Sequence, residues 1–165
     1  MKCKKCHRNL LTVKKRYLKT RFGIKEIAKL LEHIGIDISQ YQSLLTYFLG
    51  FLEPSYVLCD KCFNEVQSLV SKMNDAMKHC WCVELVSCNY RGRKKYCGDG
   101  IHIESLFCKN KDDASFQLRS IAMFYDCDMV IDVRWDFETK SEDTEHGGTY
   151  YYKVFRISGT AVKKC

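Results

Sequence analysis

Residues 128–137 read DMVIDVRWDF, and this stretch decides the fold class of the second half of the chain. Apolar residues occupy every odd position from Met129 to Phe137, whereas charged residues occupy positions 132, 134 and 136. Side chains of a β-strand alternate between its two faces, so this period of two predicts a strand with one buried face and one exposed face.

The sequence around this strand predicts more β-structure. Residues 149–158, TYYYKVFRIS, are rich in aromatic and β-branched side chains and predict a partner strand. The polar residues 139–149 between them suit a hairpin loop. Residues 101–107 predict a further strand, and residues 115–125 predict either a strand or a helix. We therefore expect a mainly antiparallel β domain over residues 81–165.

The first half of the chain has the periodicity of helices instead. Apolar residues recur at helical spacing over residues 24–34, and Gly35 follows as a stop signal. Residues 41–52 predict a buried helix, and residues 63–80 predict a long amphipathic helix. Residues 1–80 are thus expected to form an α-rich module, and the whole chain to be α+β.

Composition limits the setting of the protein. No apolar run approaches the ~20 residues that a membrane helix needs, and the basic N-terminus lacks the apolar core of a signal peptide. An intracellular protein without a membrane partner is therefore expected. Its 11 cysteines would then be kept reduced, which argues against a disulfide framework and favours metal binding.

Two Cys-x-x-Cys pairs predict a metal site in the first half. Four thiolates complete the tetrahedral shell of a closed structural zinc site, so one zinc ion is expected on Cys3, Cys6, Cys59 and Cys62. Scattered free thiols, or a redox-active pair, are the alternatives.

These residues carry a resemblance to a known family. The pair at 3–6, the run IAKLLEHIGIDIS, the approach FLEPSYVLCDKC and the helix FNEVQSLVSKMNDAMKHC resemble the zinc-finger-associated domain (ZAD) of insect transcription factors. The resemblance covers residues 1–80 and implies a treble-clef-like module, one zinc on the four cysteines, and a homodimer formed through the long helix. This chain has Lys4 where the family usually has arginine, and it contains no Cys₂His₂ finger.

The long helix also predicts dimerisation independently of the resemblance. Its apolar stripe is large for a module of this size, so part of it is expected to pack on a second copy; packing within the chain is the alternative. The residues concerned are Phe63, Val66, Leu69, Val70, Met73 and Met77.

Basic residues raise the alternative of direct nucleic-acid binding. Residues 1–30 hold 11 Lys or Arg and one acidic residue, Glu26. A second basic group lies between Tyr90 and Tyr96, where aromatic side chains could stack on bases; a solvated hairpin tip is the alternative. This group is Arg91, Arg93, Lys94 and Lys95.

Two further alternatives concern metals in the second half. The cysteines of the second half could bind a second zinc ion, or they could be buried as small apolar residues. These are Cys80, Cys82, Cys88, Cys97, Cys108 and Cys127. A magnesium-dependent nuclease could use Asp126, Asp128, Asp132 and Asp136 with Glu138 and Lys140, although alternating charge on a strand already accounts for Asp132 and Asp136.

The sequence therefore predicts a non-enzymatic zinc protein that dimerises and takes part in transcription or chromatin processes in the nucleus. Its expected partners are a second copy and other nuclear proteins, with DNA or RNA as the alternative. No residue is assigned a catalytic role.

Overall fold

The structure is a computed structural model, and it describes residues 24–36, 60–90, 95–145 and 147–165. The chain forms two compact units, Met1–Asp75 and Ala76–Cys165. The described residues form three α-helices, a short 3₁₀ helix and four strands, which confirms the α+β class. The helix predicted at 41–52 lies outside the described residues, as do three of the four predicted zinc ligands, Cys3, Cys6 and Cys59.

Helix α1 spans Ile24–His33, as its periodicity predicts. Gly35 ends it with a φ of +83°, in the left-handed region that glycine adopts without strain. The N–H groups of Gly35 and Ile36 donate to the carbonyls of Glu32 and Leu31 and so satisfy the last turn. Four residues share the buried face: Ile27, Ala28, Leu30 and Leu31.

Helix α3 spans Asp60–His79 and confirms the predicted long amphipathic helix. The boundary between the two units falls inside it, after Asp75. The short 3₁₀ helix η3, Cys80–Cys82, follows directly. No helix among the described residues combines the length and the apolar character needed to cross a bilayer.

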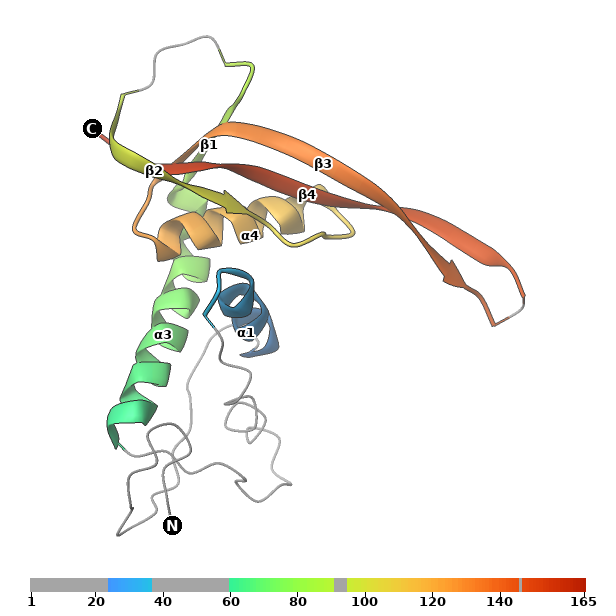
Figure 1. Ribbon diagram of the computed structural model, residues 1–165, viewed down its shortest axis with the longest axis horizontal. Helices are drawn as coiled ribbons and strands as arrows, with labels where there is room; N and C mark the ends of the chain where they lie inside the picture. Colours follow the sequence, from blue (N-terminus) through green and yellow to red (C-terminus); the bar gives the residue numbers. More distant parts are fainter. Residues whose placement is uncertain (1–23, 37–59, 91–94, 146) are drawn as a thin grey trace. The chain divides into compact units, whose positions relative to one another are not determined.

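The second unit is built on a four-stranded sheet (Figure 1). Its strands are β1 (Glu84–Ser87), β2 (Tyr96–Glu104), β3 (Met129–Asp143) and β4 (Thr149–Lys164), in the spatial order β1-β3-β4-β2. The β2–β4 and β3–β4 pairs are antiparallel, whereas β1 pairs with β3 in parallel. The sheet is therefore mixed, and the predicted strands at 128–137 and 149–158 are confirmed.

Helix α4, Lys111–Phe124, connects β2 to β3, and β4 lies between these two strands in the sheet. Of the two structures expected for residues 115–125, the helix is correct and the strand is wrong. Asn110 caps the helix, because its side chain accepts from the N–H of Asp113 at 2.7 Å. The helix contacts β2, β3, β4 and η3. Its buried residues include Ala114, Leu118, Ile121, Ala122 and Phe124.

A β-bulge interrupts β3 and corrects the predicted alternation. Ile131 pairs with Thr160 and Arg134 with Ser158, so β3 has one residue more than β4 between these pairs. The extra residue is accommodated at Asp132, whose φ is +55°. Opposite it lies Gly159, where a Cβ atom would come within 2.8 Å of the Ile131 carbonyl.

The bulge reverses which face the following side chains occupy. Met129 and Ile131 lie on one face, where they form a small core cluster with Val86 and Val162. Trp135 and Phe137 lie on the opposite face, because they pair with Ile157 and Phe155. The apolar residues of DMVIDVRWDF therefore do not share one face.

The other edge strand, β2, is also irregular. Its register with β4 shifts between Cys97 and Ile101. A disulfide joins Cys97 to Cys165 just beyond β4 and ties this edge together. This disulfide corrects the expectation that all 11 cysteines stay reduced, which was based on the expected intracellular setting.

Candidate interaction surface on the β3–β4 hairpin

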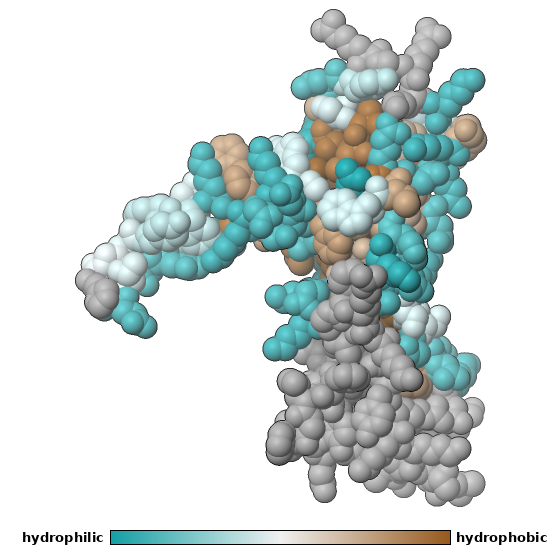
Figure 2. Space-filling view, turned by 180° about the vertical axis from the view of Figure 1, so that it is seen from behind, coloured by the Kyte–Doolittle hydropathy of each residue, from teal (hydrophilic) through white to brown (hydrophobic). Residues whose placement is uncertain are grey.

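The outer part of the β3–β4 hairpin extends beyond the rest of the sheet and beyond α4 (Figure 1). We call residues Arg134–Asp143 of β3 and Thr149–Ser158 of β4 the arm. Every residue from Arg134 to Asp143 is exposed. In Figure 2 the arm shows hydrophilic side chains interleaved with paler, more apolar ones. A two-stranded ribbon this exposed is marginal by itself, so its base needs additional contacts.

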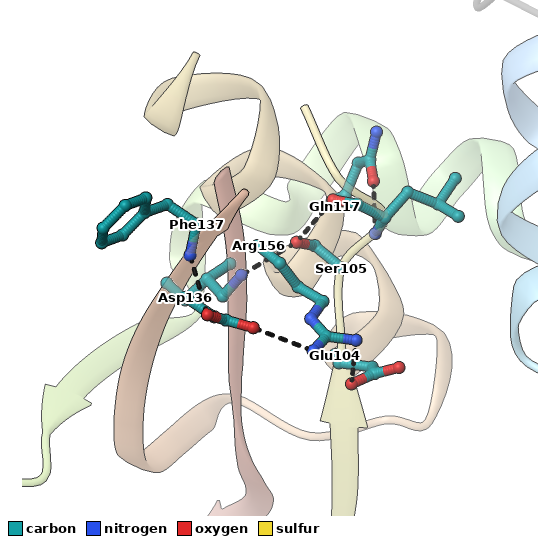
Figure 3. Close-up of polar contacts among 8 residues, drawn as sticks. Glu104, Ser105, Gln117, Asp136, Phe137 and Arg156 are labelled. Atoms are coloured by element: carbon teal, nitrogen blue, oxygen red, sulfur yellow. Dashed lines mark hydrogen bonds and ion pairs between the residues drawn. The ribbon is translucent and has the colours of Figure 1, made fainter. Parts of the chain in front are cut away.

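Arg156 supplies contacts at the base of the arm (Figure 3). Its guanidinium lies 3.0 Å from the carboxylate of Asp136 on β3 and 3.4 Å from that of Glu104 on β2. The Cζ atom of the same guanidinium lies 4.7 Å from the centroid of the Phe107 ring, in a cation–π contact. One side chain therefore bridges the strands on both sides of β4. Because these pairs are partly exposed, they orient the arm more than they stabilise the fold.

A buried serine fixes the end of β2 nearby. Ser105 is fully buried, and its hydroxyl accepts from the N–H of Ile157 at 3.1 Å. The next backbone N–H, of Leu106, donates to the side chain of Gln117 on α4 at 3.1 Å. The chain leaving β2 is thus held to β4 and to α4, which gives the arm a fixed base (Figure 3).

Aromatic side chains are the main feature of the arm surface. Trp135 is 43% exposed, Phe137 58%, Tyr150 60% and Tyr151 68%. Two rings have a cation above them: Lys111 of α4 lies 5.3 Å from the Trp135 centroid, and Lys153 lies 5.0 Å from that of Phe137. These contacts hold the rings in place and leave them accessible.

A pair of tyrosines lies on the face of the arm opposite to Trp135 and Phe137. Tyr150 and Tyr152 stack with their centroids 5.9 Å apart, and Lys109 lies 4.9 Å from the Tyr152 centroid. The Tyr152 hydroxyl donates to Glu142 at 2.6 Å. This hydrogen bond stabilises the protonated phenol and raises the pKa of Tyr152.

The backbone of β3 is open along the arm. β1 pairs with β3 only as far as Val133, and within the described part of the chain no strand pairs with the outer edge of β3 from Arg134 onward. Exposed backbone N–H and C=O groups in such an edge can accept another strand. The outer edge of β4 is less open, because Ser105 and Cys108 bond to Ile157 and Phe155.

The predicted zinc site falls largely outside the described residues. Cys3, Cys6 and Cys59 belong to that part of the chain, and Cys62 is buried in the first turn of α3. Among the residues that the structure describes, no three His, Cys, Asp or Glu side chains are grouped to hold a metal. The zinc site and its four ligands stay a prediction.

The predicted dimerisation residues are mostly covered within the single chain. Val66, Val70, Met73 and Met77 are buried, whereas Phe63 and Leu69 are half-buried. This burial favours the alternative that the stripe packs within its own chain. No second copy is present, so dimerisation through α3 stays a prediction.

Of the predicted nucleic-acid group, only Lys95 lies within the described residues, and it is exposed. Arg91, Arg93 and Lys94 lie outside them. Of the residues considered for a nuclease, Asp136 is held by Arg156 and Lys140 lies 6.0 Å from the Phe107 ring. Both observations fit structural roles in the arm.

The cysteines considered for a second metal are distributed over the second unit. Cys82 and Cys88 are exposed, and Cys97 is in the disulfide. The other three are buried, and burial raises the pKa of each thiol and so disfavours the thiolate that zinc needs. They are Cys80, Cys108 and Cys127. This burial fits their use as small apolar residues.

Sequence reasoning missed the arm as a surface because it assigned the alternating apolar residues to a buried face. It also assigned residues 139–149 to a hairpin loop, whereas residues 139–143 belong to β3 and Thr149 begins β4. The two strands at 129–143 and 149–164 are longer than the 14-residue helix α4 can cover, since a strand rises about 3.3 Å per residue and a helix only 1.5 Å. The outer part of the hairpin therefore extends past the end of α4.

Comparison with family models, with curated proteins and with solved structures finds no match for this chain. The resemblance of residues 1–80 to the zinc-finger-associated domain therefore has no support beyond the residues that carry it. Functional arguments for the second unit depend on its geometry alone.

Proposed function

We propose that this protein is a non-enzymatic protein-interaction module and that the arm is its interface. The observation that carries the proposal is the exposure of Trp135 and Phe137 on one face of an ordered ribbon. Large aromatic side chains are enriched in protein interfaces, where their burial supplies much of the binding energy. Their exposure in a single chain favours an interface that a partner covers.

The charge of the arm favours a protein partner over a nucleic acid. Residues 134–158 hold four basic side chains, which are Arg134, Lys140, Lys153 and Arg156, against five acidic ones. A phosphate backbone is attracted by an excess of positive charge, which the arm lacks. Direct nucleic-acid binding through residues 1–30 or the basic group near Lys95 stays a separate prediction.

The fixed base of the arm supports the same proposal. Arg156 connects three strands, and Ser105 ties β2 to β4. A surface that is held in its bound shape loses little conformational freedom when a partner docks. The arm is therefore preorganised for binding.

Photo-crosslinking in cells tests the proposal. A photoreactive phenylalanine analogue replaces Phe137 in one form of the full chain and Ile101 in another. Ile101 is a matched control, because it is 43% exposed on β2, away from the arm. We expect illumination to attach a protein at position 137 and not at position 101. We also expect Trp135→Ser to abolish the adduct.

The mass of the adduct identifies the partner class. A protein adduct that requires Trp135 supports the proposal, whether the partner is a second copy or a different protein. Equal labelling at positions 137 and 101, or an adduct to nucleic acid only, contradicts it.

The first half of the chain supports separate proposals. We propose that Cys3, Cys6, Cys59 and Cys62 hold one structural zinc, as the spacing of their Cys-x-x-Cys pairs indicates. A role in transcription or chromatin and a nuclear or other intracellular location depend on the basic first half and on the resemblance alone.

A further inference from the structure

The outer edge of β3 is the most open backbone in the described part of the second unit. Edge strands are commonly protected by a bulge, a proline, a covering segment or charged side chains, and of these β3 has only charged side chains beyond Val133. β2 has its irregular register, and the base of β4 is bonded by Ser105 and Cys108. From Arg134 to Asp143 the pairing of β3 with β4 is regular, and this segment contains no proline.

We propose that the occupant of this edge is a second copy of the same edge, added antiparallel so that two arms form one continuous four-stranded ribbon. This inference depends on the proposed function, since it names the partner of the same surface. A two-fold axis perpendicular to the ribbon would relate the copies, as is usual for homodimers. The axis would pass between the two copies of Glu138, so that Glu138 faces its equivalent in the second copy.

The charges on one face of β3 carry the inference. Every second residue from Arg134 to Glu142 lies on the same face, in the order Arg134, Asp136, Glu138, Lys140, Glu142. With the axis at Glu138, Arg134 lies opposite Glu142 of the second copy, and Asp136 lies opposite Lys140. Symmetry doubles both attractive pairs, and only the central glutamates repel each other.

Neighbouring registers are less favourable. With the axis at Phe137, Arg134 would face Lys140 and Asp136 would face Glu138, and both pairs repel. With the axis at Thr139, Glu138 would face Lys140 but Asp136 would face Glu142, so attraction and repulsion balance. Among these three registers, the charge order favours the one at Glu138.

The aromatic face of the arm fits the same register. Phe137 would lie opposite Thr139 of the second copy, an aromatic and β-branched pair that stabilises antiparallel sheets. Trp135 would lie opposite Ser141, a small residue that leaves room for the indole ring. The exposed rings of the single chain would thereby gain cross-strand neighbours.

Analytical ultracentrifugation of the full chain over a range of concentrations tests the proposal. We expect a reversible dimer. Arg134→Glu places like charges opposite each other at two symmetric positions and is expected to weaken the dimer by about tenfold. The double variant Arg134→Glu/Glu142→Arg restores opposite charges and is expected to recover most of the affinity. Lys163→Glu on β4 is a matched control, because it makes the same charge change at an exposed residue outside the arm.

The outcomes separate this inference from the proposed function. A dimer that Arg134→Glu weakens and the double variant restores supports the β3 register. A monomer at every concentration, or a dimer insensitive to Arg134→Glu, overturns it. In either of those cases the cross-link at position 137 still decides the proposed function, since it then captures a different protein or none.

Discussion

Asp132 determines how the arm presents its side chains. It takes a left-handed conformation that costs most L-residues about 1–2 kcal/mol, and aspartate is one of the few that adopt it readily. Gly159 opposite it leaves the space that the bulge needs. These two residues turn Trp135 and Phe137 away from the face of Met129.

Substitutions at Asp132 test the role of the bulge. Asp132→Val is expected to lower the free energy of unfolding by about 1–2 kcal/mol, because a β-branched residue is strained at positive φ. Asp132→Gly is expected to be at least as stable as the parent chain, because glycine adopts this conformation freely. Urea unfolding of both variants measures the difference. Equal midpoints for the two would show that Asp132 is not held at positive φ.

The bulge also shows why the pattern of DMVIDVRWDF predicted a strand correctly and its faces incorrectly. Period two is a local signal and identifies β3 reliably. A bulge changes the pairing by one residue and leaves the composition unaltered, so the pattern alone cannot locate it. The open edge of β3 was equally hidden, since strand order depends on pairing between distant segments.

The sequence predicted the bounds of a helix best where apolar residues form a continuous stripe along it. Helices α1 and α3 follow their predicted ranges closely, because each buries one continuous face. Helix α4 was ambiguous, since its segment mixes β-branched and aromatic residues with helix formers. In the structure this segment is a helix that begins after the cap residue Asn110 and connects β2 to β3.

The disulfide between Cys97 and Cys165 is expected to stabilise the sheet. It links two residues 68 positions apart and joins β2 to the residue just beyond β4. Cys165→Ser is expected to reduce the stability of the second unit by about 2–4 kcal/mol, because the open chain gains conformational entropy when unfolded. Thermal unfolding with and without a reductant measures this loss. The reductant should lower the midpoint of the parent chain and leave that of Cys165→Ser unchanged; a parent midpoint insensitive to reductant would contradict the pairing.

The chain consists of two units, and the evidence that bears on function differs between them. For residues 1–75, the four cysteines and the long helix indicate a zinc module, and the chemistry of thiolate spacing carries that prediction. For residues 76–165, the sheet and its arm carry the argument, and the sequence alone did not reveal them. The proposed interaction function is compatible with both predictions.

Hydrogen exchange along β3, followed by mass spectrometry at low and high concentrations of the full chain, tests whether the arm edge pairs with a second copy. Adding a strand satisfies the outward N–H groups of β3 and slows their exchange. Pairing of this edge with a second copy predicts that peptides covering residues 134–143 exchange more slowly at high concentration, whereas peptides from α4 do not change. Exchange over residues 134–143 that is equally fast at every concentration would contradict it.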